Sequence, residues 1–230
     1  MKIVCIGNLF GEIDIINEYI EEANADIALL MGNIGIFYRN KDKNLPKSFV
    51  DNQFYKYLEG RVRFTAPVFT IRGPHDNFDL AEKIEDQDIV IDNFHVIRNG
   101  EVVYYDGVNI GGVGGAYSPV AYELDKLTGV YKRNFNKKQF SALMGKKVDI
   151  LLLHDVMGDC SKKRINFSDS FLECIASCRP FYTLVGRFGW WAHAQLQYGN
   201  CLVFPNAKDG YVILDTETWD AEGIKKGKDE

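Results

Sequence analysis

The chain opens with apolar runs that alternate with amphipathic segments. "KIVCIG" (2–7) is β-branched and ends at glycine, which is typical of a strand buried on both faces. "DIALLMG" (26–32) and "APVFTIRG" (66–73) repeat this pattern. Between the runs, residues 12–23 and 49–60 place apolar side chains at helical spacing. This β-α-β-α-β order predicts a parallel sheet with right-handed crossovers.

The pattern changes in the second half of the chain. Short apolar runs broken by "DN", "NG" and "DG" over 88–115 indicate hairpins and tight turns. A buried strand is predicted at 148–155, a helix around 169–178 and several short strands over 181–217. The tail 223–230 is predicted to fray. Parallel α/β units followed by hairpins predict two stacked sheets with helices outside.

Composition narrows the possible functions. The 230 residues are 46% hydrophobic and 26% charged, as in an ordinary globular protein, and we expect a single domain over 1–222. The net charge of −5 gives no overall basic field to attract nucleic acid. Five cysteines and no evident signal peptide favour a reducing cytoplasm, and no apolar run is long enough to suggest a membrane. Cys174 and Cys178 are interpreted as small buried hydrophobes.

Five predicted strands end in a glycine or polar turn. The turns are "IGNLFG" (6–11), "MGNIG" (31–35), "RGPHDN" (72–77), "LLHD" (152–155) and "VGRFG" (185–189). In an α/β sheet such strand ends line one crevice, where ligands bind.

The order of these turns resembles the calcineurin-like metallophosphoesterase family, whose signatures run D-x-H, G-D, G-N-H-D/E, H and G-H-x-H. Within that family the chain is most similar to the RNA lariat debranching enzymes, through "FVDNQFYKYLEG", "VVYYDGVNIGGVGGAY" and "YKRNFNKKQF". The resemblance implies an α/β fold, a four-layer αββα sandwich of two mixed sheets flanked by helices. It also implies two divalent metals that clamp a phosphoester and activate a water.

At the matching positions of this chain, most metal ligands are replaced. The residues that stand where the family has ligands are Asn8, Phe10, Asn33, Pro74, Arg187 and Gly189, and only His154 keeps a ligand type. Two dications about 4 Å apart repel by roughly 16 kcal/mol at an effective dielectric near 20, so anionic ligands are needed. We therefore expect no dinuclear site, no metal cofactor and no catalytic residues, with His75 and Asp76 left as remnants.

Three interpretations of the altered crevice stay open. The first is a metal-free anion site, since arginine bonds two phosphate oxygens at once; its residues would be Asn8, Asn33, Arg72, His75, His154 and Arg187. The second is a phosphodiesterase with a relocated single metal such as Mn or Fe, held near Asp14, Asp79, Asp155 or His193. The third is a structural subunit whose crevice is closed by Phe10 and the tryptophans.

The leading hypothesis is a non-catalytic protein that binds phosphate, a nucleotide or RNA, or serves as a regulatory scaffold. A protein partner or a second copy of the chain is also considered. Phe188, Trp190 and Trp191 either stack on bases or pack into the core. The segment 131–138, "YKRNFNKK", carries Lys132, Arg133, Lys137 and Lys138; it is either a solvated basic loop or, as in the debranching enzymes, near RNA.

Overall fold

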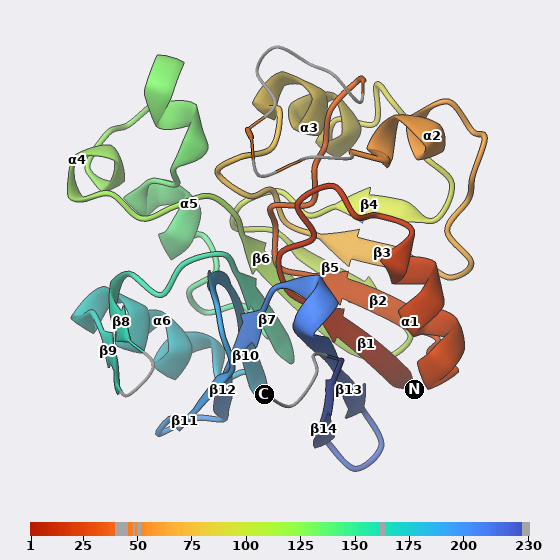
Figure 1. The fold of residues 1–230 in the computed structure, drawn as a ribbon. Helices are drawn as coiled ribbons and strands as arrows, with labels where there is room; N and C mark the ends of the chain where they lie inside the picture. The colour runs from red at the N-terminus through yellow and green to blue at the C-terminus, as the bar shows by residue number, and fades with distance from the viewer. Residues whose placement is uncertain (40–45, 48, 50–51, 162–163, 227–230) are drawn as a thin grey trace.

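Two six-stranded sheets stack face to face in this computed structural model, and helices cover the outer face of each sheet (Figure 1). The structure describes residues 1–39, 46–47, 49, 52–161 and 164–226. The predicted αββα sandwich with two mixed sheets is confirmed. Within the described ranges, no helix has the length and apolar character needed to cross a membrane.

The first sheet has the strand order β14-β13-β1-β2-β3-β4. Its strands are β1 (Lys2–Ile6), β2 (Ile27–Leu30), β3 (Val68–Thr70), β4 (Phe94–Val96), β13 (Gly210–Asp215) and β14 (Asp220–Lys225). Strands β1, β2 and β3 run parallel, as predicted. Strand β4, in the segment where hairpins were predicted, instead pairs in parallel with β3, and β13 adds to β1 antiparallel. Its helices are α1 (Ile15–Ala23), α2 (Phe54–Leu58) and α3 (Phe78–Glu85).

The second sheet has the order β11-β12-β10-β7-β6-β5. Its strands are β5 (Val102–Tyr105), β6 (Val108–Val113), β7 (Ile150–Leu153), β10 (Tyr182–Gly189), β11 (Ala192–Gln195) and β12 (Asn200–Pro205). The four central strands are parallel, and the two edge strands are antiparallel to their neighbours. The remaining elements are α4 (Pro119–Tyr122), η1 (Gly129–Arg133), α5 (Lys137–Ser141), the hairpin β8 (Gly158–Ser161) and β9 (Arg164–Phe167), α6 (Asp169–Cys178) and η2 (Ala207–Asp209).

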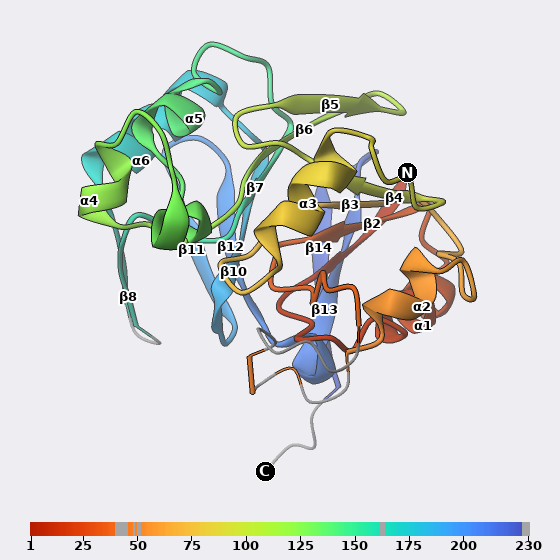
Figure 2. The same ribbon diagram turned by 90° about the horizontal axis from the view of Figure 1, so that it is seen from above.

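Three apolar clusters hold these layers together. Ile3, Leu29, Ile110 and Leu152 are buried between the two sheets. A second cluster packs α1, α2 and α3 on the first sheet, and a third packs α5 and α6 on the second sheet. Figure 2 shows that α1 and α2 lie on the opposite side of the molecule from α5 and α6. Burial of apolar surface on both faces explains why the central strands read as continuous apolar runs.

Three predicted details need correction. Of the helix predicted over 49–60, the described residues form a helix at Phe54–Leu58, which begins just after Asn52, whose side chain donates to Gly35 O and accepts from Phe54 N. Residues 50–51 lie outside the described part. Helix α3 was not predicted; the Asn77 side chain caps it by accepting from Leu80 N at 3.0 Å. Strand β14 includes the first three residues of the segment predicted to fray, and residues 227–230 lie outside the described part.

Candidate functional site

The turns that follow β1, β2, β3 and β7 meet the second half of β10 at the place where the sequence predicts a crevice, a name kept here for this group of residues. The turn predicted at 185–189 lies within β10, where the pairing register with β12 shifts between Val185 and Gly189. Glycines allow these backbones to touch. A Cβ added at Gly73 would lie 2.0 Å from the backbone nitrogen of Asn33, and one at Gly186 would lie 2.5 Å from Met31 O. Gly32 has φ +83°, a conformation that side chains other than glycine rarely adopt. The glycines thus bring the predicted site residues of different strands within hydrogen-bonding distance.

The floor of the crevice is a chain of hydrogen bonds between neutral side chains. Asn8 donates from Nδ2 to Gly186 O and accepts at Oδ1 from Asn33 Nδ2, at 3.1 Å. The same Asn33 nitrogen lies 3.4 Å from Nε2 of His154. His75 completes the chain through its backbone N–H, which donates to Asn33 Oδ1 at 3.2 Å. Three of the predicted anion-site side chains, those of Asn8, Asn33 and His154, are therefore buried and bonded to one another.

His154 is held in one tautomer. Its Nδ1 lies 2.7 Å from Met31 O, and since a carbonyl can only accept, Nδ1 carries the proton and Nε2 faces the Asn33 amide as an acceptor. Burial lowers the pKa of His154 to about 4, and the positive charges of Arg187 and His75 act in the same direction. The imidazole is therefore neutral at physiological pH.

The carboxyl group of Asp76 accepts hydrogen bonds from the backbones of two of the loops. Its Oδ1 accepts from Gly35 N at 2.8 Å and from Ile36 N at 3.2 Å, while Oδ2 accepts from Gly73 N at 2.7 Å. Burial raises the pKa of this carboxyl, and the backbone N–H bonds oppose the shift. The carboxylate predicted as a catalytic remnant is 3% exposed and serves to join the loop 33–36 to the loop 72–77.

Charged side chains lie at the mouth of the crevice. Arg187 is 47% exposed and pairs through Nη1 with Asp155, whose carboxylate is fully buried and also accepts from Tyr117 N at 2.8 Å. His75 is partly exposed; partial burial and the charge of Arg133 lower its pKa. Arg187, His75 and Arg133 therefore place positive or protonatable groups around the neutral floor.

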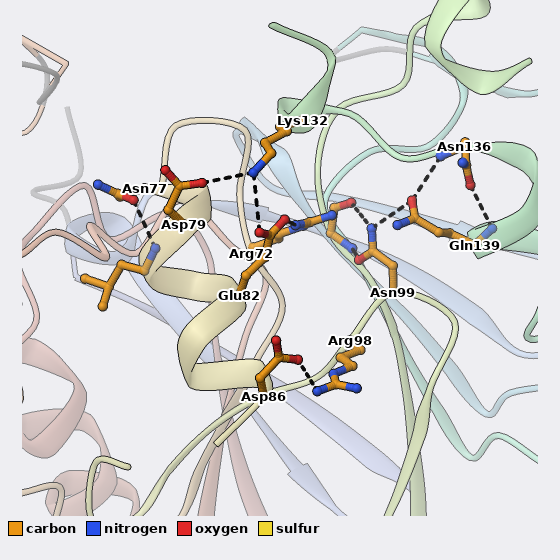
Figure 3. A network of polar contacts seen from close by, with 12 residues as sticks. Arg72, Asn77, Asp79, Glu82, Asp86, Arg98, Asn99, Lys132, Asn136 and Gln139 are labelled. Atoms are coloured by element: carbon orange, nitrogen blue, oxygen red, sulfur yellow. Dashed lines mark hydrogen bonds and ion pairs between the residues drawn. The ribbon is translucent and has the colours of Figure 1, made fainter. Parts of the chain in front are cut away.

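The structure does not bring Arg72 into this crevice. Its guanidinium lies in a second cavity, where Nη1 is 3.7 Å from Glu82 Oε1 (Figure 3). Lys132 reaches Asp79 and the same Glu82, at 2.9 and 3.4 Å. The predicted basic segment is thus divided, because Arg133 acts on His75 whereas Lys132 is already paired with α3. Sequence reasoning missed this division because the strand register that turns Arg72 away from the crevice has no local signal.

The aromatic residues beside the crevice pack against apolar neighbours. Phe10 has φ 49° and its ring meets Phe49 edge to face, with centroids 5.4 Å apart. Trp191 packs on Phe204 at the edge of the inter-sheet core. Trp190 lies 5.2 Å from the ring of Phe188, and its buried Nε1 has no partner among the described residues. Trp191 thus packs at the core, and the ring of Phe10 packs against Phe49.

The carboxylates and histidine considered for a relocated metal do not converge. Asp14 bonds to Lys56 and Tyr57, Asp79 to Lys132 and Asp155 to Arg187, while His193 lies 3.0 Å from Asn200 Oδ1 on another part of the second sheet. Among the described residues, no three His, Cys, Asp or Glu side chains form a group that could hold a metal ion. The neutral, mutually bonded donors of the crevice do not fit a pair of divalent ions, which need anionic ligands.

Comparisons with known proteins agree with this geometry. The family model of the calcineurin-like phosphoesterases matches residues 1–177. A lariat debranching enzyme of Schizosaccharomyces pombe is 23% identical over 171 residues, which are 67% of this chain and 36% of that enzyme. The chain therefore spans about a third of the length of that relative.

Two solved structures share the fold. A protein of Thermus thermophilus has a TM-score of 0.66 at 16% identity, covering 98% of this chain and 99% of its own. GAP50, the anchor in the inner membrane complex of Plasmodium, has a TM-score of 0.57 at 11% identity, covering 100% and 86% of the two chains. At these identities the matches show the architecture alone.

Proposed function

Since the chain belongs to the calcineurin-like phosphoesterase family, we propose that it is a non-catalytic member that binds a phosphate-bearing ligand at the mouth of the crevice. In this proposal the binding groups are the side chains of Arg187, His75 and Arg133. The buried residues below them act as a fixed, neutral floor. The ligand is a phosphate group carried by a nucleotide or by RNA.

One observation supports the proposed loss of catalysis. The amide of Asn33 occupies the place of a bridging carboxylate, and its Nδ2 points at Asn8 Oδ1 and at His154 Nε2. These are the lone pairs that a metal would need, and an N–H donor now faces both of them. No step of phosphoester hydrolysis is assigned to these residues, because none of them can supply an activated water as arranged.

The charges at the mouth support an anionic ligand. Arg187 keeps about half of its side chain exposed despite its pair with Asp155, so part of its guanidinium can meet a ligand. The charge of Arg133 acts on His75, and the charges of both Arg187 and His75 act on His154. A phosphate placed there would gain charge-assisted hydrogen bonds from Arg187 and Arg133.

The test compares ligand effects on melting temperature in matched variants. Inorganic phosphate, adenosine monophosphate and a short RNA should each raise the melting temperature of the wild type, because they bind only the folded state. Arg187→Ala and Arg133→Ala should reduce that shift. Arg61→Ala, which removes an exposed arginine paired with Glu59, should leave it unchanged. Each shift is measured against the ligand-free variant, since Arg187→Ala also leaves Asp155 without its counter-ion.

The same protein distinguishes the competing functions. Hydrolysis of bis(p-nitrophenyl) phosphate in added manganese, abolished by His154→Ala, would establish a single-metal phosphodiesterase and overturn the proposal. Absence of any ligand-induced shift would instead favour a protein-binding scaffold. A shift with RNA that exceeds the shift with the mononucleotide would identify the polymer as the ligand.

A further inference from the structure

A second cavity lies between α3, η1 and α5, outside the crevice. Its volume is about 410 Å³, within the range of sites that take small organic molecules. Arg72 and Glu82 line one wall, Asn99 and Gln139 the next, and Lys132 closes the side towards α3 (Figure 3). The side chains that bind at the crevice, including His154 and Arg187, are not part of this lining.

Arg72 is the buried cation of this cavity, and its guanidinium has few hydrogen-bond partners among the described residues. Arg72 is 7% exposed, yet its ion pair with Glu82 spans 3.7 Å, which is too long for a hydrogen bond. Its Nε is buried and has no hydrogen-bond partner among the described residues. Leaving a buried guanidinium with so few partners is unfavourable, so an anion that completed its hydrogen bonds would stabilise the folded protein.

The charges around the cavity specify what kind of anion fits. Four cations line it, namely Arg72, Lys126, Lys132 and Lys138, and two carboxylates, Glu82 and Asp125. Four positive and two negative charges leave a net charge of +2. A phosphate monoester carries about −1.5 to −2 at neutral pH and offers three oxygens, which suits cations that approach from separate elements.

We propose that this cavity is a binding site for a small organic phosphate monoester, with Arg72 as the principal contact to the phosphoryl group. Lys126 and Lys138 approach from the outer rim, where both are exposed. Gln139 is held in place, because its side-chain Oε1 accepts from Asn136 N at 3.1 Å and its backbone N–H donates to Asn136 Oδ1 at 3.0 Å. These bonds leave its Nε2 to meet a hydroxyl of the ligand.

This site is independent of the ligand proposed for the crevice. Arg187 and Arg133 are absent from its lining, and so are Asn8, Asn33 and His154. Variants at the two places therefore separate the two proposals. Binding that needs Arg187 belongs to the crevice, and binding that needs Lys138 belongs to the cavity.

The experiment measures binding of ribose 5-phosphate by calorimetry, with ribose as the matched neutral probe. We expect saturable binding of the phosphate and at least a tenfold weaker response to ribose. In a nitrogen-correlated NMR spectrum, the Arg72 Nε–Hε signal should shift as its unpartnered donor gains an acceptor. The signal of Arg187 should change less.

Adjacent lysines on α5 supply matched variants. Lys138→Ala should weaken binding about two- to fivefold, as expected for one exposed charge, whereas Lys137→Ala, which removes an exposed lysine outside the lining, should have no effect. Arg72→Leu should abolish binding. Glu82→Gln should strengthen it, because a competing carboxylate is removed.

Three results would overturn the proposal. The first is no saturable binding of ribose 5-phosphate at millimolar concentration. The second is equal affinity in Lys137→Ala and Lys138→Ala together with loss of binding in Arg187→Ala. The third is equal or tighter binding of a dicarboxylate such as succinate, since this would show that the cavity selects charge and not the phosphoryl group. The lysine variants keep the test decisive even where Arg72→Leu fails to fold.

Discussion

The crevice and the Arg72 cavity lie close together along the chain and have opposite electrostatic designs. In the crevice, Asn8, Asn33 and His154 are neutral and bonded to one another. In the cavity, Arg72 is charged, its ion pair with Glu82 spans 3.7 Å, and its Nε has no hydrogen-bond partner among the described residues. The family's signature positions fall in the first region, and the unsatisfied charge falls in the second.

This difference shows that neighbouring polar groups can either bond to one another or leave a charge with few partners. Asn8 and Asn33 stand where the resemblance places carboxylates, and the Asn33 amide lies 3.4 Å from His154 Nε2. Polar groups that bond internally stabilise the fold and have little left for a ligand. We propose ligand binding instead for Arg187, which stands at a family ligand position and is 47% exposed, and for Arg72, just before the third signature.

The largest expected effect on stability comes from removing the carboxylate of Asp76, which joins two loops of the crevice. Asp76→Ala leaves the backbone N–H groups of Gly35, Ile36 and Gly73 buried without their acceptor. At about 1–3 kcal/mol for each unsatisfied group, the loss should exceed 3 kcal/mol in the free energy of unfolding. Urea denaturation followed by tryptophan fluorescence measures it.

Two further variants sharpen this test of Asp76. Asp76→Asn keeps the oxygen that serves Gly35 and Ile36 and loses one acceptor, so it should cost about a third as much. Asp79→Ala, at an exposed carboxylate three residues away, should cost below about 1 kcal/mol. An alanine variant within 1 kcal/mol of the wild type would show that Asp76 does not join the two loops.

The sequence was sufficient for the fold and for part of the site. Buried parallel strands are recognisable as apolar runs such as "DIALLMG". Four of the five predicted turns follow strands, and the fifth, 185–189, lies within β10. Residues 8, 33 and 154 meet as expected because strand ends define their positions. Arg72 could not be placed in the same way, since whether a side chain at a strand end turns inward depends on register and packing set by distant elements.

The next prediction concerns the effect of the Glu85 carboxyl group on stability. Glu85 lies on α3 one turn after Glu82, and burial raises its pKa from 4.5 to about 7, against the opposing charge of Arg72. Because the folded state holds this proton more tightly than the unfolded state, Glu85 lowers stability progressively as pH rises from 4.5 to about 7. Glu85→Gln should therefore gain on the order of 2 kcal/mol at neutral pH and almost nothing below pH 4.5.

His154 changes stability with pH in the direction opposite to that of Glu85. His154 has a pKa of about 4 in place of 6.5, so the unfolded state binds its proton more tightly and stability rises with pH across that interval. The two groups partly offset each other in the wild type. Glu85→Gln should thus expose a steeper rise of stability with pH, measured by urea denaturation across this range. Identical pH profiles for the variant and the wild type would contradict the assignment.

The smallest expected effect on stability is that of Lys132, which lines the Arg72 cavity and pairs with α3. Lys132 of η1 bridges Asp79 and Glu82, whose side chains are 79% and 44% exposed, and such exposed pairs contribute little. Lys132→Ala should cost less than about 1 kcal/mol, and that cost should disappear near 1 M salt, because screening removes surface attractions. Arg63→Ala, which breaks the exposed pair with Asp92, serves as the control and should have no measurable effect. A salt-independent loss above 2 kcal/mol would instead show that Lys132 fixes η1 against α3 by packing, and that the wall between crevice and cavity is rigid.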